Sequence, residues 1–274
     1  MPDAGANPVL MGVLNVTPDS FSDGGRFLDV EAAVAHARRM IGEGAGIVDV
    51  GGESTRPGAE PVSVAEELER VVPVVAALRD CGVPLSVDTR HAAVMRAALD
   101  AGASMINDVS ALTADPDSLV VAAASEASVV LMHAQGDPRT MQDAPRYDDV
   151  LAEVLAYLER RIEACAAAGI ARGRLIVDPG IGFGKTLEHN LVLLRNLGRF
   201  RDLGCRVLLG ASRKSFIGRL SGVSDPAVRV PGSLAAALAG VLQGVHILRV
   251  HDVAETRQAI EVWRAIFQPT IESP

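Results

Sequence analysis

The stretch "RLIVDPGIGFGKT", residues 174–186, decides the fold, because it joins a short apolar run to a polar, glycine-rich turn. A helical pattern of apolar residues follows at 187–200. The order of strand, polar turn and helix is that of one βα unit. One such unit cannot bury its own apolar face, so the fold depends on how often the unit recurs along the chain.

Seven further apolar runs end in the same way, in a polar or glycine-rich segment. They occupy residues 9–16, 46–52, 83–89, 104–110, 128–133, 206–212 and 245–252. Helical patterns lie at 30–44, 63–82, 91–102, 116–127, 147–169, 187–200, 232–244 and 253–267, and several end in glycine. Eight units without a low-complexity linker predict an α/β fold in which residues 1–274 form a single-domain (β/α)8 TIM barrel, allowing for short disordered tails. An open doubly wound sheet is the alternative.

Composition and charge narrow the class of protein. Hydrophobic residues make up 49% of the chain and aromatic residues 3%, which suits short aliphatic strands covered by alanine-rich helices. The formal net charge of -8 argues against a nucleic-acid partner. No uncharged apolar span reaches about 18 residues, and the three cysteines are widely spaced. We expect a soluble, cytoplasmic protein with no membrane partner.

The Gly-Lys-Thr triplet at the end of the opening stretch suggests a phosphate-binding P-loop. That pattern requires a further glycine at the place where this chain has Pro179, which has no N–H to offer. Asp178, directly after the apolar run, is also unsuited to a phosphate. The segment therefore needs another explanation.

Polar side chains at the strand ends should be considered together, because reactive groups of such barrels lie at the carboxyl ends of the strands. These ends carry Asn15, Glu53, Asp88, Asn107, His133, Asp178, Ser212 to Lys214, Arg249 and His251. Singly, such an Asp or Asn is often a helix cap or turn former. Together, Asp88, Asn107 and Asp178 are suited to a flat heterocycle rich in donors and acceptors. His133 is at least as often structural as catalytic, so it is not a candidate.

Basic residues follow the last two apolar runs, where barrels of this type commonly hold phosphate. They are Arg213, Lys214, Arg249 and His251, although a solvated position also explains Arg213. Arg249 and His251 are two apart on a strand and face the same side. Thr55 and Arg56, in a Gly/Pro-rich loop, can add to this predicted anion pocket.

The segment "NVTPDSFSDGG", residues 15–25, follows the first apolar run and has two interpretations. It can be a flexible turn. It can also be a mobile lid, with Phe21 closing against a substrate.

With these motifs in place, the chain resembles the dihydropteroate synthase family of folate biosynthesis over essentially its whole length. The matching segments are "GVLNVTPDSFSDGG", "DVGGESTRPGA", "SVDT", "NDVS", "LMHAQGDPRTMQ", "DPGIGFGKT", "GASRKSF" and "RVHDV". The combination of "SRKSF" with "ESTRPGA" separates this family from pterin-binding methyltransferase barrels. The resemblance implies a transferase that joins p-aminobenzoate to 6-hydroxymethyl-7,8-dihydropterin pyrophosphate, with Mg2+ on the departing pyrophosphate.

The resemblance also implies roles for individual residues. The pterin would contact Asp88, Asn107, Met132, Asp178, Phe183, Lys214 and Arg249. The pyrophosphate would contact Asn15, Arg56, Arg249 and His251, with Asn15 also a ligand of Mg2+. The p-aminobenzoate would contact Phe21, Thr55, Pro57, Phe183, Lys214 and Ser215. Catalysis would rest on Asp23, Asp178, Lys214 and Arg249.

Physical chemistry is compatible with those roles. Pyrophosphate leaves readily once its charge is neutralised, so electrostatic stabilisation would carry most of a dissociative substitution. The arylamine is unprotonated at neutral pH and needs no strong base.

Two alternative functions remain, a catalytically silent pterin-binding paralogue and a methyl-transfer module acting with a corrinoid partner. The family resemblance further implies a homodimer built from the last helices, although core packing explains the apolar surface of residues 232–244 equally well. It also implies a target for sulfonamides, although the sequence leaves sulfonamide sensitivity open.

Overall fold

Eight parallel strands close into one barrel, in the order β1 to β8. The computed structural model describes residues 7–16, 26–53, 62–136, 141 and 144–267. The strands are β1 (Val9–Asn15), β2 (Ile47–Gly51), β3 (Leu85–Asp88), β4 (Met105–Asp108), β5 (Ser128–Met132), β6 (Leu175–Asp178), β7 (Arg206–Leu209) and β8 (Ile247–Val250). Pairing of β1 with β8 completes the ring, so the predicted TIM barrel is confirmed and the open sheet is wrong.

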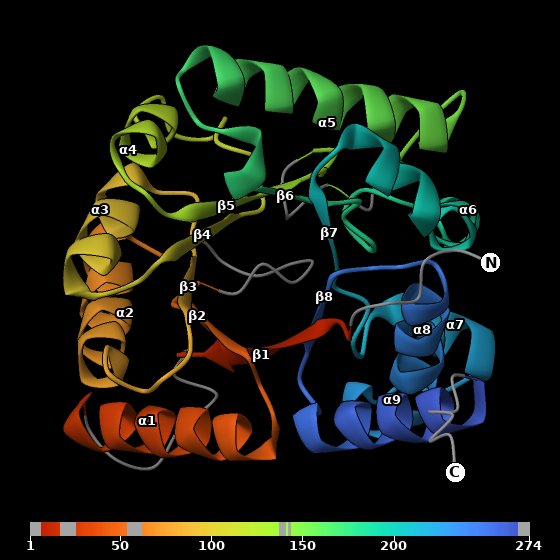
Figure 1. Ribbon diagram of the computed structural model, residues 1–274, viewed down its shortest axis with the longest axis horizontal. Coiled ribbons are helices and arrows are strands. Elements are labelled where there is room, and N and C mark those ends of the chain that lie inside the picture. Colours follow the sequence, from red (N-terminus) through yellow and green to blue (C-terminus); the bar gives the residue numbers. More distant parts are fainter. Residues whose placement is uncertain (1–6, 17–25, 54–61, 137–140, 142–143, 268–274) are drawn as a thin grey trace, which may run out of the picture.

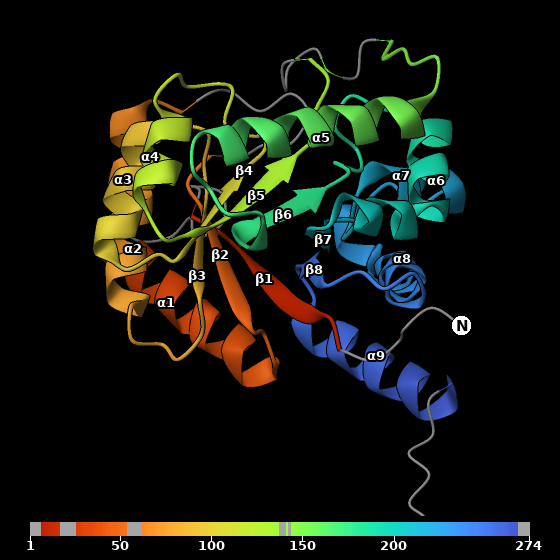
Figure 2. The same cartoon turned by 45° about the horizontal axis from the view of Figure 1, so that its top comes forward.

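Helices surround this barrel, as Figures 1 and 2 show. They are α1 (Arg26–Glu43), α2 (Val64–Leu78), α3 (Ala92–Ala101), α4 (Ser118–Ala124), α5 (Val150–Ala167), α6 (Leu187–Arg195), α7 (Ser215–Ser221), α8 (Val230–Leu242) and α9 (Val253–Phe267). Each predicted helical segment overlaps one of them, although α1 and α8 begin before the predicted positions 30 and 232. Helix α7 was not predicted, because seven residues are too few to show a helical period.

One predicted helix, 187–200, is divided in the structure. Helix α6 ends at Arg195, and a 3₁₀ helix covers Leu197–Leu203. Between them Asn196 donates from its side chain to the carbonyl of Val192 at 2.8 Å. Such local side-chain bonds compete with the helix ladder, which explains the break.

The inside of the barrel is filled by an apolar plug of seven buried side chains. They are Met11, Ile47, Met105, Val130, Ile176, Leu208 and Ile247. Two residues further along most of these strands, on the same face, come Asp49, Asn107, Met132, Asp178, Gly210 and Arg249. The strand period of two therefore places a polar layer directly on the plug. We call Asp49, Asp88, Asn107, Asp178 and Arg249 the polar layer below.

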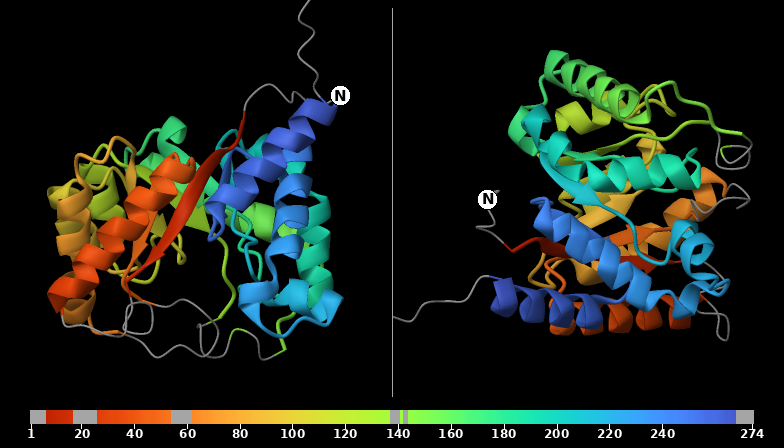
Figure 3. Two further views of the ribbon diagram at one scale, coloured as in Figure 1. Left: turned by 90° about the horizontal axis from the view of Figure 1, so that it is seen from below. Right: turned by 90° about the vertical axis from the view of Figure 1, so that its right-hand side faces the viewer.

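The polar layer lies towards the carboxyl ends of the strands. In the left panel of Figure 3 the arrow of β1 points downwards, so the carboxyl ends of the parallel strands lie at the lower side of that view. Among the helices that the structure describes, none combines the length and the hydropathy of a membrane-spanning segment.

Candidate functional site

Arg249 stands at the centre of the polar layer, held between two carboxylates. Its Nε donates to Asp49 Oδ2 at 2.7 Å, and a terminal guanidinium nitrogen, Nη2, donates to Asp88 Oδ2 at 2.7 Å. Burial alone would lower the pKa of Arg249, but the two carboxylates outweigh it and raise the pKa above its ordinary value. The guanidinium therefore stays charged at all working pH values.

Asp88 and Asn107 are register neighbours on β3 and β4. Asn107 Nδ2 donates to Asp49 Oδ2 at 3.0 Å, so it shares that oxygen with Arg249. Burial raises the pKa of Asp88 to about 7; the charge of Arg249 opposes the shift and that of Asp49 adds to it. Asp88 Oδ1 is buried without a hydrogen-bond partner in the described part of the chain, so it is an acceptor in need of a donor.

Asp178 and Lys214 lie close together beside Gly210. A Cβ built on Gly210 would lie 3.7 Å from Asp178 Oδ2 and 3.8 Å from Lys214 Nζ. Burial lowers the pKa of Lys214 to about 8, and the charge of Asp178 opposes the shift. Burial likewise raises the pKa of Asp178, against the charge of Lys214. The pair offers an acceptor and a cation to one ligand.

The Lys214 side chain is held in this position by contacts with the glycine-rich loop. Its Nζ donates to the carbonyl of Ile181 at 2.5 Å and lies 4.6 Å from the centre of the Phe183 ring. Phe183 is half-buried, with its ring under the ammonium. An aromatic face beside a cation is a surface on which another ring can pack.

The loop over residues 178–186 is held from below by Lys185, whose side chain is 1% exposed. Its Nζ contacts the carbonyl of Phe183 at 2.9 Å, the carbonyl of His133 at 3.2 Å and His133 Nδ1 at 2.9 Å. All three ammonium donors have partners inside the protein. Lys185 therefore fastens the loop to the end of β5, and the structural interpretation of His133 is supported.

Other residues of the loop also have hydrogen-bond partners within the protein. Asp178 Oδ1 accepts from the N–H of Gly180 at 2.8 Å, and Asn190 Oδ1 from α6 accepts from the N–H of Gly182 at 2.7 Å. Thr186 caps α6 by accepting from the N–H of His189 at 3.2 Å. The Lys-Thr pair thus serves as an anchor and a helix cap, which accounts for the segment without a phosphate.

The predicted anion residues are in part brought together. His251 Nδ1 lies 3.0 Å from Ser212 Oγ, linking the ends of β8 and β7, and Asn15 is half-buried at the end of β1. Arg213 instead forms a bidentate ion pair with Asp252, with Nε and Oδ2 3.0 Å apart. Arg213 therefore does not add to the mouth, whereas Lys214 and Arg249 do.

Other predicted residues are placed as follows. Met132 is 4% exposed and pairs in register with Asp178, whereas Ser215 is exposed as the first residue of α7. The strand-end residue Glu53 lies outside the polar layer and pairs with Arg90, with 3.0 Å between Oε1 and Nη2. Phe21, Asp23, Thr55, Arg56 and Pro57 lie outside the described residues.

Asp49 is a member of the polar layer that the strand-end pattern did not select. It lies in the middle of the apolar run 46–52, and its side chain is fully buried. The sequence feature that could have revealed Asp49 is a single carboxylate between two valines. Its position in the strand is one whose side chain points into the barrel, because strand side chains alternate with a period of two.

Metal binding by protein carboxylates alone has no basis in the described residues, which contain no group of three His, Cys, Asp or Glu arranged for it. Mg2+ needs oxygen ligands and commonly keeps several waters while bridging substrate phosphates. Asn15 offers one amide oxygen. One protein ligand suits a Mg2+ ion that takes its other ligands from water and substrate phosphates.

Known proteins resemble this chain closely. The family described as pterin binding enzyme matches residues 11–251. Dihydropteroate synthase of Escherichia coli strain K12 is 52% identical over 261 residues, covering 95% of this chain and 92% of that protein. The structure of Xanthomonas albilineans dihydropteroate synthase with 4-aminobenzoic acid has a TM-score of 0.89 and 53% identity, covering 95% of this chain and 93% of that one. A second structure from that organism, in complex with 7,8-dihydropteroate, has a TM-score of 0.86 and 50% identity, covering 95% and 94% of the two chains.

Proposed function

The chain belongs to the dihydropteroate synthases among the pterin binding enzymes, and from this premise we infer that the polar layer is the centre of its active site. The enzyme is a transferase that joins p-aminobenzoate to 6-hydroxymethyl-7,8-dihydropterin pyrophosphate, giving 7,8-dihydropteroate and pyrophosphate. One observation carries the location: Asp178, Lys214 and Arg249 all lie within 4 Å of a Cβ built on Gly210, and Arg249 is paired with the carboxylates of Asp49 and Asp88.

The pterin edge is matched by the acceptors of this layer. Asp88 and Asp178 each have an oxygen suited to the N–H groups of the ring, and Asn107 adds an amide. Met132 supplies an apolar contact beside Asp178. Arg249 covers one face of the heterocycle, and Lys214 approaches it with an ammonium group.

The substitution breaks the bond between the methylene carbon and the pyrophosphate oxygen and forms a bond from that carbon to the arylamine nitrogen. Lys214 and Arg249 are fixed cations close to the developing charges, and Asp178 stabilises the positive charge that spreads into the pterin. Preorganised charges in a water-poor site do this at little cost in reorganisation. After attack the amine nitrogen loses one proton to water or to the released pyrophosphate. Asp23 completes this set in our proposal, from outside the described residues.

Pyrophosphate would be bound by Arg249 and His251, with Arg56 and Asn15 beside them. Mg2+ would be held by Asn15 and substrate oxygens, and would neutralise charge on the leaving group. The p-aminobenzoate would pack on Phe183 near Lys214 and Ser215. Phe21, Thr55 and Pro57 complete that pocket in our proposal.

Removal of Mg2+ with EDTA is expected to stop pyrophosphate release, and added Mg2+ to restore it. Because Asn15 gives the ion a single neutral ligand, Asn15→Ala should raise the Mg2+ concentration for half-maximal rate by about tenfold rather than abolish turnover. A Mg2+ titration of the initial rate measures this. Asn196→Ala, at the far end of α6, is the control. An unchanged Mg2+ requirement in Asn15→Ala would remove this residue from the metal site.

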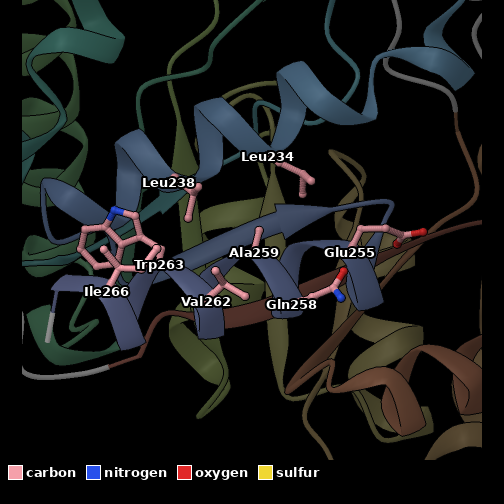
Figure 4. A pocket seen from close by; sticks show the side chains of 8 residues that line it. All are labelled: Leu234, Leu238, Glu255, Gln258, Ala259, Val262, Trp263 and Ile266. Atoms are coloured by element: carbon pink, nitrogen blue, oxygen red, sulfur yellow. The ribbon is translucent and has the colours of Figure 1, made fainter. Parts of the chain in front are cut away.

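We also propose that the enzyme is a homodimer formed through α8 and α9, which lie side by side (Figure 1). A groove of about 350 Å3 runs between them. Figure 4 shows its apolar lining, with Leu234 and Leu238 from α8 opposite Val262 and Trp263 from α9. Val262 is 56% exposed, and exposed apolar clusters of this kind favour a protein partner.

Sedimentation at micromolar concentration should therefore give a dimer, and Val262→Glu should raise the dissociation constant by about a hundredfold, because it buries an unpaired charge. Val120→Glu, at a similarly exposed valine on α4, is the matched control. A wild-type protein that sediments as a monomer would refute the proposal.

A cytoplasmic location is the remaining part of the proposal. Cys81, Cys165 and Cys205 are all unpaired, and two of them are buried. Free buried thiols are usual in a reducing compartment, where disulfides are rare.

A further inference from the structure

We propose that Asp49 is a positioning residue of the active site: its buried carboxylate fixes the Arg249 guanidinium and the Asn107 amide in the orientations that the pterin requires. The inference rests on the function proposed above. It adds a residue that lies beneath the ligand and acts through two others.

The contacts of one oxygen carry the inference. Asp49 Oδ2 accepts from Arg249 Nε at 2.7 Å and from Asn107 Nδ2 at 3.0 Å, so a side chain on β2 links β8 and β4 across the barrel. The second donation of Arg249, to Asp88, leaves the guanidinium plane held at two points. Two charge-assisted bonds of this length fix a long side chain that would otherwise rotate.

Asp49 also decides which atom Asn107 presents. An Asn side chain offers an oxygen acceptor on one side of the amide and N–H donors on the other. Because Nδ2 points to Asp49, the amide oxygen lies on the opposite side. The layer then presents acceptors from Asp88, Asn107 and Asp178 together, which suits a heterocycle edge that donates.

Burial argues against an ordinary stabilising role. Asp49 is 0% exposed, and its Oδ1 has no hydrogen-bond partner in the part of the chain that the structure describes. A buried ion pair that leaves one oxygen unsatisfied is seldom better for stability than an apolar group of similar size. A requirement for orientation explains the carboxylate better than packing does.

The charge of Asp49 has a consequence that can be measured. Charged groups from several of the described elements act on Asp88. Arg249 from β8 and Lys214, directly before α7, are cations, whereas Asp49 from β2, Glu67 from α2 and Asp108 from β4 are acidic. Burial raises the pKa of Asp88, Arg249 lowers it, and the three acidic groups raise it further. If ionised Asp88 accepts from the pterin, activity is lost as the pH falls through this pKa. Removing the charge of Asp49 should therefore move the acid limb to lower pH.

The test is Asp49→Asn, assayed for dihydropteroate formation as a function of both substrates and of pH. We expect kcat/KM for the pterin pyrophosphate to fall by about 10- to 100-fold, the effect of losing a charge-assisted bond. KM for p-aminobenzoate should change by less than about threefold, and the acid limb should move to lower pH. Ser86→Ala, at a buried polar residue that pairs in register with Asp49, should leave all three unchanged.

Each other result is decisive. A kcat/KM within about twofold of wild type would overturn the inference, and so would a fall without displacement of the acid limb, which would indicate packing alone. If Asp49→Asn does not fold, Asp49→Ser is assayed in its place, and failure of both to fold would make Asp49 a structural residue. An inactive wild-type enzyme would instead refute the proposed function and would be recognised before any variant is made.

Discussion

Lys214→Ala is expected to lower kcat/KM for the pterin pyrophosphate by about a thousandfold, the upper end of the loss caused by removing one preorganised charged donor. The ammonium group is the cation that faces Asp178 above Gly210, and it also closes the glycine-rich loop through the carbonyl of Ile181. The charge of Lys214 lowers the pKa of Asp178, so its loss should raise that pKa further and impair both members of the pair. Steady-state kinetics with both substrates measures the effect.

Arg213→Ala is the control for Lys214→Ala, because the neighbouring basic side chain is committed to Asp252. It should lower thermal stability while kcat/KM of the folded enzyme stays within about fivefold of wild type. Comparable losses in both variants would mean that the loop, rather than the ammonium group, had been damaged.

The wild-type enzyme should also lose activity as the pH rises above about 8, because the folded pKa of Lys214 is depressed to about that value and its positive charge disappears there. The chain has only two lysines, Lys185 and Lys214. Biosynthetic labelling with lysine that carries 13C at Cε would therefore allow both pKa values to be followed by NMR with little overlap. The kinetic limb should follow the Lys214 signal.

Gly180→Ala is expected to destabilise the enzyme by about 3 kcal/mol or more and to abolish most of its activity. Gly180 has a φ of +68°, and a Cβ there would lie 1.9 Å from the carbonyl oxygen of His133. That carbonyl is also a partner of Lys185, so the loop cannot yield without losing its anchor. Thermal unfolding should show a Tm lowered by about 6 °C or more.

The matched control for Gly180→Ala is Gly222→Ala, at the end of α7. Its φ is +75°, and nothing lies within 4 Å of a Cβ built there. The same backbone strain without the steric conflict should cost about 1 kcal/mol and leave kcat/KM unchanged. Equal losses of stability in the two variants would show that the close approach to His133 has no effect.

The barrel and much of its mouth could be predicted from the sequence, because both depend on local patterns. Eight apolar runs, each with a helical pattern after it, predict a closed ring, which the structure confirms. The position at the end of a run was enough to select Asp88, Asn107 and Asp178. The exclusion of a P-loop followed from Pro179. The structure adds that the ammonium group of Lys185 is engaged by the His133 ring and by two carbonyl groups.

Features that depend on spatial neighbours could not be predicted in this way. Glu53 and Arg213 lie in the expected segments, yet each is paired with a residue far along the chain, Arg90 and Asp252. Asp49 lies inside an apolar run, and its partners come from β4 and β8. The roles given to Phe21, Asp23, Thr55, Arg56 and Pro57 stay predictions, because these residues lie outside the described ranges.

The measurement to make first is pyrophosphate release by the wild-type enzyme from the pterin pyrophosphate with Mg2+, in the presence and absence of p-aminobenzoate. If the polar layer is the active site of a dihydropteroate synthase, release should depend on p-aminobenzoate and should equal the dihydropteroate formed, mole for mole. Tight binding of the pterin pyrophosphate without release in either case would contradict that assignment and would indicate a catalytically silent pterin-binding protein.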